Sequence, residues 1–372
     1  MIKIRKRLII ILCLLVTPAY AADPWLNLPD NPFITDGTYH RRDPSEIIYI
    51  TDTYYMYYNR LDSTAADSFD TEFGNIACAS SPSITGPWTE QSVVINNGDG
   101  VDEANPGSAG NACTGNAEWD CTGLVAPSAT VDGTDIQLFY NGLLEFVTRT
   151  KSIGVATGST ADPCGTFTKS GSNPFFAPTG VPGDWDEDLA ASQFILKMGD
   201  ATWRMYYKGR DISEDKRHVG FATINDAGFP DGTWTRYAGN PVFGNSVNGS
   251  PAIEVDDMAV LPVNGIMYMM FQEPNLNTDA SWYQSPNGID TWTDASATFA
   301  TILASSLVGT WAEDENLGYG SGSLHGKIMY MNSGGLVAPN KDSIGLFVIP
   351  YGILSQGVGG TFTLGGSGSF TQ

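Results

Sequence analysis

Apolar and aromatic residues recur along this chain in short runs of four or five positions, separated by Gly, Asp, Asn and Pro. No long segment has the 3.6-residue period of an amphipathic helix. Short apolar or alternating runs bounded by turn residues are typical of strands. The pattern therefore predicts an all-β protein.

The runs also repeat at a larger scale, about every 65 residues, as in proteins built from repeated supersecondary units. In each copy a short first strand and a turn precede a second strand rich in aromatic residues and Met. These second strands are predicted at residues 54–58, 137–140, 203–207, 267–271 and 328–331. Third strands follow at residues 76–79, 153–156, 219–222, 282–284 and 344–347. A Trp-Thr phrase opens a fourth strand in several copies. Four short strands in five copies predict a five-bladed β-propeller.

The beginning of the sequence has the form of a secretory signal peptide. A basic start, an apolar run at residues 8–16 and an Ala-Tyr-Ala cleavage site at residues 19–21 follow one another. The apolar run is too short to span a bilayer. We predict a signal peptide at 1–21, a single propeller domain at 22–372, and a secreted or periplasmic protein.

The net charge of the protein limits the kinds of partner it can bind. The chain has 19 Lys and Arg against 41 Asp and Glu, a formal net charge of -22. This acidity argues against nucleic acid or an anionic membrane as partner.

Four cysteines follow the predicted signal peptide, and an even number in an exported protein suggests disulfides. Cys113 and Cys121 are close enough to clip one loop, which would leave Cys78 to pair with Cys164. The sequence contains no C-x-x-C spacing of the kind that binds zinc, and no cofactor is predicted.

The first strand of each propeller blade lines the central channel, so the residues that begin these strands converge on one mouth. Cleaving a glycosidic bond requires two carboxyl groups at such a place. Asp43 begins the first of these strands, beside Pro44, which stiffens the backbone; an ordinary Asp-Pro-Ser turn is the alternative interpretation. Asp256 is assigned the same register in the fourth copy and is predicted to be the acid, with Asp257 and Glu254 as rivals.

In the third copy the corresponding position is Ala190, which has no acid-base chemistry. One of Asp186, Glu187 and Asp188 just before it could reach the mouth, and Asp188 is chosen as the third candidate carboxylate. Substrate-binding roles are predicted for His40, Arg42, Arg210, Trp119 and His325. The basic residues could instead pair with the carboxylates and lower their pKa values, and the Trp residues could equally fill gaps between strands.

The segment RRDPSEIIYITDTYYMYYN at residues 41–59 resembles the opening blade of the five-bladed clan of glycoside hydrolase families 43, 62 and 117, and is most like family 117. Residues 205–210, 219–222 and 239–242 resemble the third blade of families 117 and 43. The resemblance implies an inverting glycoside hydrolase that acts on a poly- or oligosaccharide, such as a marine galactan, with Asp43 as general base. Related propellers sometimes hold calcium in the channel.

The resemblance does not identify which residue of this protein is the general acid. Family 117 has a His-Glu pair where this protein has Asp256 and Asp257, and family 43 has a Glu there. Three other functions remain open. They are a non-catalytic carbohydrate-binding propeller, a sialidase-like propeller suggested by SPNGIDTW at residues 285–292, and a phosphorylase, which would need basic residues at the mouth to bind phosphate.

Overall fold

The computed structural model describes residues 26–27, 40–61, 74–96, 119–120, 123–143, 150–212, 216–244, 253–263, 265–272, 280–295, 321–325, 328–337 and 341–350. These residues form strands and no helix, which confirms the predicted all-β class. None of their segments is a helix of the length and hydropathy needed to cross a membrane. The predicted signal peptide and the pair Cys113 and Cys121 lie outside the described residues.

The described strands form four sheets, and the eight-stranded one contains two antiparallel groups joined by one parallel pairing. We divide it there and number the resulting antiparallel units along the chain. Unit 1 contains β2 (His40–Arg42), β3 (Ile48–Ile50), β4 (Thr53–Leu61), β5 (Asn75–Ser81) and β6 (Thr89–Ile95). Unit 2 contains β7 (Gly123–Asp132), β8 (Asp135–Leu143), β9 (Lys151–Ser159) and β10 (Thr168–Lys169). Unit 3 contains β11 (Leu189–Lys197), β12 (Thr202–Asp211), β13 (Lys216–Asn225) and β14 (Thr235–Arg236). Unit 4 contains β15 (Met258–Val263), β16 (Ile266–Gln272), β17 (Ala280–Ser285) and β18 (Thr293–Asp294). Unit 5 contains β19 (Ser321–His325), β20 (Ile328–Val337), β21 (Lys341–Pro350) and, from the start of the sequence, β1 (Leu26–Asn27).

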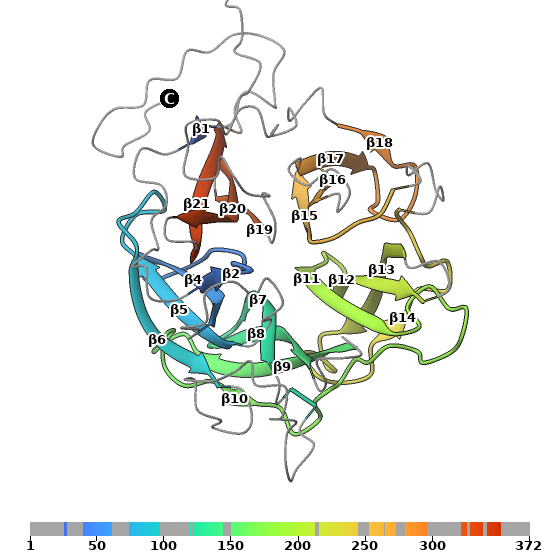
Figure 1. Cartoon of the computed structure of the whole chain (residues 1–372), viewed down its shortest axis with the longest axis horizontal. Coiled ribbons are helices and arrows are strands. Elements are labelled where there is room, and N and C mark those ends of the chain that lie inside the picture. Colours follow the sequence, from blue (N-terminus) through green and yellow to red (C-terminus); the bar gives the residue numbers. More distant parts are fainter. Residues whose placement is uncertain are drawn as a thin grey trace, which may run out of the picture.

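The units lie around a common centre, with the first strand of each unit innermost (Figure 1). Units 2 and 3 are joined into one sheet by a single parallel pairing between Leu189 and Lys151. In unit 5, β1 adds to the edge of β21, where Leu26 pairs with Val348. A strand from the beginning of the sequence therefore completes the unit formed by its end.

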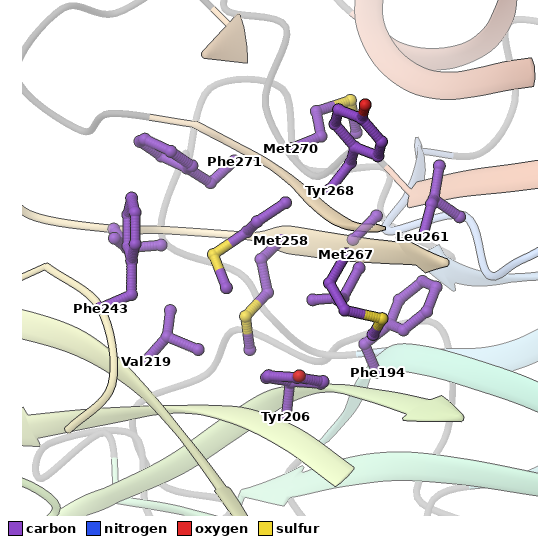
Figure 2. Packing of buried hydrophobic residues seen from close by; sticks show 14 of the residues in the cluster. Phe194, Tyr206, Val219, Phe243, Met258, Leu261, Met267, Tyr268, Met270 and Phe271 are labelled. Carbon is purple, nitrogen blue, oxygen red and sulfur yellow. The ribbon is translucent and has the colours of Figure 1, made fainter. Parts of the chain in front are cut away.

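The core lies between neighbouring units, and the predicted aromatic and Met strands supply it. Figure 2 shows one such interface, in which Tyr206 and Phe194 of unit 3 face Met258 and Met267 of unit 4. Trp292 of the Trp-Thr phrase is buried in the same cluster. These side chains are therefore packing residues, and burial of apolar area at about 25 cal/mol per Å² holds the units together.

A disulfide links units 1 and 2. Cys78 of β5 is bonded to Cys164, which lies between β9 and β10, and their Cα atoms are 5.5 Å apart. This confirms the predicted pairing of Cys78 with Cys164. Because the two cysteines are separated by 86 positions in the sequence, the bond closes a long loop.

A Trp-Asp pair is fixed in the same way in units 2 and 3. In unit 3, Trp185 covers the backbone at Gly209 and Gly220. The neighbouring Asp186 accepts a hydrogen bond of 2.8 Å from the Tyr207 hydroxyl. In unit 2, Trp119 covers Gly142 and Gly154, and Asp120 accepts a 3.0 Å bond from the hydroxyl of Tyr140. Each pair ties a loop to the second and third strands of its unit.

Replacing Gly209 by Ala is expected to lower the free energy of unfolding by about 1–3 kcal/mol, as overpacking does. The new Cβ would lie 2.4 Å from the Trp185 ring and 2.7 Å from the Asp186 Cβ. Urea unfolding would measure the loss. Gly199→Ala is the matched control, because a Cβ there meets no atom within 4 Å. Equal stability of the two variants would contradict a fixed position for Trp185.

Candidate active site

The same unusual backbone occurs in three units, between β2 and β3 in unit 1 and within β7 and β11 in units 2 and 3. Asp43, Ala126 and Ser192 have φ values of 49°, 48° and 48°. Non-glycine residues rarely adopt this left-handed conformation. The pairing of β7 with β8 shifts just after Val125, and that of β11 with β12 shifts just after Ala191. Such bulges re-aim side chains and are frequent beside active sites. We call the three residues the entry positions.

This geometry corrects the predicted register in unit 3. The entry position there is Ser192, a hydroxyl-bearing residue, and Ala190 lies two residues before it. Ala190 is an ordinary member of β11 and pairs with Gly209. The prediction aligned the copies by their small residues and could not see the bulge between the two positions.

The register in unit 4 is corrected as well. After the bulge in unit 2, pairing resumes between Ser128 and Phe139, two residues beyond the entry position. The pair with the same spacing in unit 4 is Ala259 with Met270. Asp257 does not share the left-handed φ, but it lines the smaller cavity together with Asp43, Ala126 and Ser192, and Asp256 does not. We therefore take Asp257, not Asp256, as the entry position of unit 4.

The four entry positions line one pocket of about 170 Å³ at the centre of the units. Apart from Val125, Ala126 and Leu189, its lining is polar or charged. The lining side chains are Asp43, Asn59, Val125, Ala126, Asn141, Lys151, Leu189, Ser192, Lys208, Arg210, Arg217, Asp256 and Asp257. A smaller cavity of about 30 Å³ shares all four entry positions with it and adds Glu46 and Gln193. The structure thus brings the predicted Asp43, Asp256 and Arg210 together.

Asp43 is held at the boundary between the two cavities. Its Oδ2 accepts a 3.0 Å hydrogen bond from the backbone N–H of Ala126 in the next unit. The side chain is half-buried and lines both the pocket and the cavity. A carboxylate fixed by a backbone donor and open to a pocket is suited to take a proton from a bound water.

Asp257 faces the same two cavities from unit 4. Its Oδ1 accepts a 2.6 Å hydrogen bond from the Ser192 hydroxyl and lies 3.5 Å from the Lys208 Nζ. Its Oδ2 is buried and has no hydrogen-bond partner among the described residues. Leaving such an oxygen unsatisfied costs about 1–3 kcal/mol. The Oδ2 atom is therefore placed to bond a ligand or water in the pocket.

Asp256 is committed to two ion pairs. Its Oδ1 bonds the Lys208 ammonium, and its Oδ2 lies 2.9 Å from an Arg217 Nη1. Burial alone would raise the pKa of Asp256, but the charges of Lys208 and Arg217 outweigh it and lower the pKa from 3.8 to about 2. A carboxyl group with this pKa holds no proton at neutral pH, which does not suit the acid role predicted for Asp256.

Asp188 acts through Arg210. Two hydrogen bonds of 3.1 and 2.5 Å join its carboxylate to Nε and Nη2 of the guanidinium, a bidentate arrangement. Arg210 lines the pocket, whereas Asp188 is absent from the lining. Asp188 therefore orients an arginine at the mouth, and the predicted position of Arg210 at the mouth agrees with the structure.

Glu46 was missed by the sequence analysis although it stands three residues after Asp43. Its Oε1 accepts a 3.0 Å bond from the Ser128 hydroxyl and its Oε2 a 2.9 Å bond from the backbone N–H of Ala129. It lines the smaller cavity together with Asp43 and Asp257. Burial raises the pKa of Glu46 from 4.5 to about 7, against the lowering effect of these hydrogen bonds. Glu46 thereby anchors the entry of unit 2 beside the pocket.

The raised pKa of Glu46 makes stability depend on pH. The native state binds this proton more tightly than the unfolded state, so the contribution is full below pH 4.5 and is lost as the pH rises through 7. At about 1.4 kcal/mol per pKa unit, Glu46→Gln should reduce the stability difference between pH 5 and pH 8 by about 2 kcal/mol. Urea unfolding at several pH values measures it.

Glu187→Gln is the matched control, because Glu187 also accepts a backbone hydrogen bond, from Gly183, but lines neither cavity. The control should keep the pH dependence of the unmodified protein. A Glu46→Gln variant with an unchanged pH dependence would show that Glu46 titrates normally in the native state.

Two asparagine side chains, Asn59 and Asn141, were also not predicted, and they hold the backbone near the entry positions of units 2 and 3. The Asn141 Oδ1 accepts a 2.8 Å bond from the Ser192 N–H, and its Nδ2 donates to Gln193 at 2.9 Å. Gln193 in turn donates to the Ala126 carbonyl at 2.7 Å. Asn59 holds the matching place in unit 1 and donates to the Leu124 carbonyl. Comparing the residue after the second-strand tyrosines in each copy could have found both Asn59 and Asn141.

The remaining predicted residues divide into two groups. Trp119 packs on Gly142 and Gly154, and its ring stacks 5.5 Å from that of Tyr140. Because the ring is packed against unit 2, its position does not suit the predicted binding of a sugar. For His40, Arg42 and His325 only the backbone is described, in β2 and β19. The predicted roles of these three side chains stay predictions.

The segment that suggested a sialidase-like function forms the connection between β17 and β18. The Ser285 hydroxyl accepts hydrogen bonds from the N–H groups of Asn287 and Gly288, and the Asn287 amide bonds the Asp290 carboxylate at 3.0 Å. None of these residues lines the pocket. The segment is a self-bonded turn.

No group of three or more His, Cys, Asp or Glu side chains within the described residues is arranged to hold a metal ion. The carboxylates of the pocket are instead engaged by Lys208, Arg210 and Arg217. The described residues therefore do not fit the calcium found in some related propellers.

No protein-family model and no curated protein matches the sequence. Among solved structures, the protein BT0996, solved as a complex with RGII, superposes with a TM-score of 0.63 at 17% identity, over 85% of this protein and 88% of that one. Zg3597, a family 117 glycoside hydrolase from Zobellia galactanivorans, gives 0.61 at 17% identity, over 85% and 87%. A GH43_1 enzyme from Xanthomonas citri gives 0.57 at 12% identity, over 91% and 92%. This protein therefore has the fold of family 117 and family 43 glycoside hydrolases, as the opening motif predicted.

Proposed function

We propose that this protein is an exported glycoside hydrolase that cleaves its substrate with inversion, in the central pocket of a five-bladed β-propeller. One observation carries the proposal. Asp43 and Asp257, at the entry positions of units 1 and 4, line the same pocket and the same adjoining cavity. The fold shared with glycoside hydrolases of families 117 and 43 supports it.

Each residue has a distinct role in this reaction. Asp43 takes a proton from a water, whose oxygen attacks the anomeric carbon. The bond from that carbon to the leaving oxygen breaks as the Asp257 carboxyl gives its proton to that oxygen. Ser192 bonds the other oxygen of Asp257 at 2.6 Å, which leaves Oδ2, the atom without a partner among the described residues, to face the leaving oxygen. We thus assign the acid role to Asp257, a rival of Asp256 from the outset.

Asp256 keeps the basic residues of the pocket in place. Burial lowers the pKa of Lys208, but the charges of Asp256 and Asp257 outweigh it and raise the pKa from 10.5, so Lys208 stays a cation. Lys208 then bridges Asp256 and Asp257. This holds Asp257 at the pocket wall between Ser192 and Lys208.

The proposal is tested with the mature protein and oligosaccharides of agar, carrageenan, porphyran, arabinan and xylan. Reducing-end release identifies a hydrolysed substrate, and proton NMR of the first-formed anomer reads the stereochemistry. Inversion is expected, since water attacks directly and no glycosyl-enzyme forms. Retention would contradict the assigned roles. Binding without release would favour the carbohydrate-binding alternative.

A further inference from the structure

Four basic side chains line the pocket from one side. Lys151 lies on β9, Lys208 and Arg210 on β12, and Arg217 on β13. The protein has 19 Lys and Arg in all and a net charge of -22. Three carboxylates, Asp43, Asp256 and Asp257, share this lining, so basic side chains outnumber acidic ones at the pocket although the protein as a whole is strongly acidic.

Two of the four stand directly opposite one another. Arg210 and Arg217 are register partners in the antiparallel pairing of β12 with β13. Like charges at directly opposed positions destabilise a sheet. Each is paired with a carboxylate: Arg210 with Asp188, and Arg217 with Asp256, which also lines the pocket and bonds Lys208. These ion pairs offset the repulsion and hold both guanidinium groups at the pocket.

The ion pairs leave binding capacity toward the pocket. Arg217 is engaged through Nη1 by Asp256, and its Nε lies 3.4 Å from Glu254. A guanidinium carries five N–H donors in a planar fork, which matches carboxylates and other oxyanions. Its side chain is 31% exposed, so a ligand can reach the remaining donors.

The rest of the lining indicates how a sugar would be recognised. No aromatic residue is among those that line the pocket, so ring stacking does not contribute at these described positions. The volume of about 170 Å³ is below the range of roughly 300–1,000 Å³ typical of drug-sized ligands. A pocket of this size admits a single sugar residue, which polar and charged groups must orient.

We propose that the sugar bound in this pocket carries an anionic substituent, a carboxylate or a sulfate ester, which Arg217 and Arg210 bind. This inference rests on the proposed hydrolase and names its substrate class. Asp43 and Asp257 act at the anomeric carbon, and the opposed arginines on β12 and β13 hold the substituent. A neutral sugar would offer no anion to the remaining donors of Arg217.

The test compares acidic oligosaccharides with their neutral derivatives. Uronate-containing oligosaccharides are assayed before and after carboxyl reduction, and sulfated galactan oligosaccharides before and after desulfation. We expect kcat/KM to fall at least tenfold on neutralisation of one of the two. The arm that responds identifies the anion. Equal hydrolysis of neutral and acidic oligosaccharides would overturn the inference and leave the proposed hydrolase intact.

Variants of Arg217 locate the effect. Arg217→Gln should raise KM for the acidic substrate about 10–100-fold with a smaller change in kcat, and Arg217→Lys should recover part of the loss. Lys197→Gln is the matched control, because Lys197 also lies within 4 Å of two carboxylates, Asp132 and Asp226, but is absent from the pocket lining. The control should keep the KM of the unmodified protein. Identical KM values for Arg217→Gln and Lys197→Gln would overturn the assignment to Arg217.

Two further results separate the inference from the hydrolase itself. Calorimetric binding of galacturonate, glucuronate or galactose 6-sulfate, without hydrolysis of any oligosaccharide, would support the anion site and contradict the hydrolase. Sugar phosphate formed on addition of inorganic phosphate would show that the arginines bind phosphate for phosphorolysis, and would overturn the proposal of an anionic sugar. Neither binding nor hydrolysis would contradict both.

Discussion

Asp43→Asn is expected to lower kcat by about 10²–10⁴-fold, the usual contribution of a general base. The amide cannot take the proton of the attacking water. Its oxygen can still accept the hydrogen bond that Ala126 donates to Asp43 at 3.0 Å. Asn also tolerates the left-handed conformation at φ 49°. The melting temperature should therefore stay close to that of the unmodified protein, and the loss should be seen in kcat at saturating substrate.

Asp52→Asn is the matched control. Asp52 also has a left-handed backbone, with φ 61°, but it is exposed in the turn between β3 and β4. Its replacement should leave kcat unchanged. A second readout separates chemistry from structure: small nucleophiles such as azide, which need no base, should restore turnover in Asp43→Asn with a glycosyl fluoride. An Asp43→Asn variant with more than a tenth of normal kcat would exclude Asp43 as the base.

Removing the disulfide should have the largest effect on stability. Cys78 and Cys164 are 86 positions apart, and closing a loop of this length restricts the unfolded state, which in the entropy model stabilises the fold by about 4–5 kcal/mol. The double variant Cys78→Ala/Cys164→Ala should lose free energy of unfolding on this scale, measured by urea unfolding under oxidising conditions. The loss should be visible even where activity per folded molecule is normal, because neither cysteine lines the pocket.

Peptide mapping under non-reducing conditions first confirms that the unmodified protein carries the bond. The single variant Cys164→Ala then serves as a comparison, since it removes the cross-link but keeps Cys78, which is fully buried in the core of unit 1. If single and double variants lose the same free energy, the cross-link accounts for the loss. A double variant as stable as the unmodified protein would mean that packing between units 1 and 2 already restrains the loop.

The repeat and the strand class could be predicted because both depend on local patterns. Each second strand alternates with turns and carries aromatic and Met residues, and these residues form the buried interfaces between units. Asp43 was predicted because Pro44 and the opening motif mark it in the sequence. The Cys78–Cys164 pair followed once the close pair Cys113 and Cys121 was set aside.

The exact composition of the site could not be predicted, because it depends on backbone conformation. The bulges that place Ala126 and Ser192 at the entry positions leave no mark in residue type. Ala190 and Asp256 were therefore assigned registers that belong to Ser192 and Asp257. Asp256 and Asp257 both line the pocket, but only Asp257 also lines the smaller cavity beside Asp43, whereas Asp256 is held by Lys208 and Arg217. A shift of one residue in the register therefore exchanges one carboxyl group for the other.

The positions of Glu46 and Trp119 could not be predicted either, because they depend on packing against segments that are distant in the sequence. A Glu after Asp-Pro-Ser is typical of a surface position, and only its bonds to Ser128 and Ala129 in the next unit show that it is partly buried. A Trp in a loop beside a predicted mouth reads as a sugar platform. Trp119 instead contacts Gly142 and Gly154, which are distant from it in the sequence. Because glycine has no side chain, neither position indicates a packing contact in the sequence.

The pairing of β1 with β21 also bears on the order in which the strands pair during folding. Leu26 meets Val348 only after almost the whole sequence has been made, so this contact has the longest sequence separation among the strand pairings described. Contacts of this kind form late because the loop-closure entropy must be met first. Until then, the edge of β21 to which β1 pairs is open to strands of other molecules. A protein cut short before residue 341 would lack β21 altogether, and the edge of β20 that pairs with β21 would be open instead.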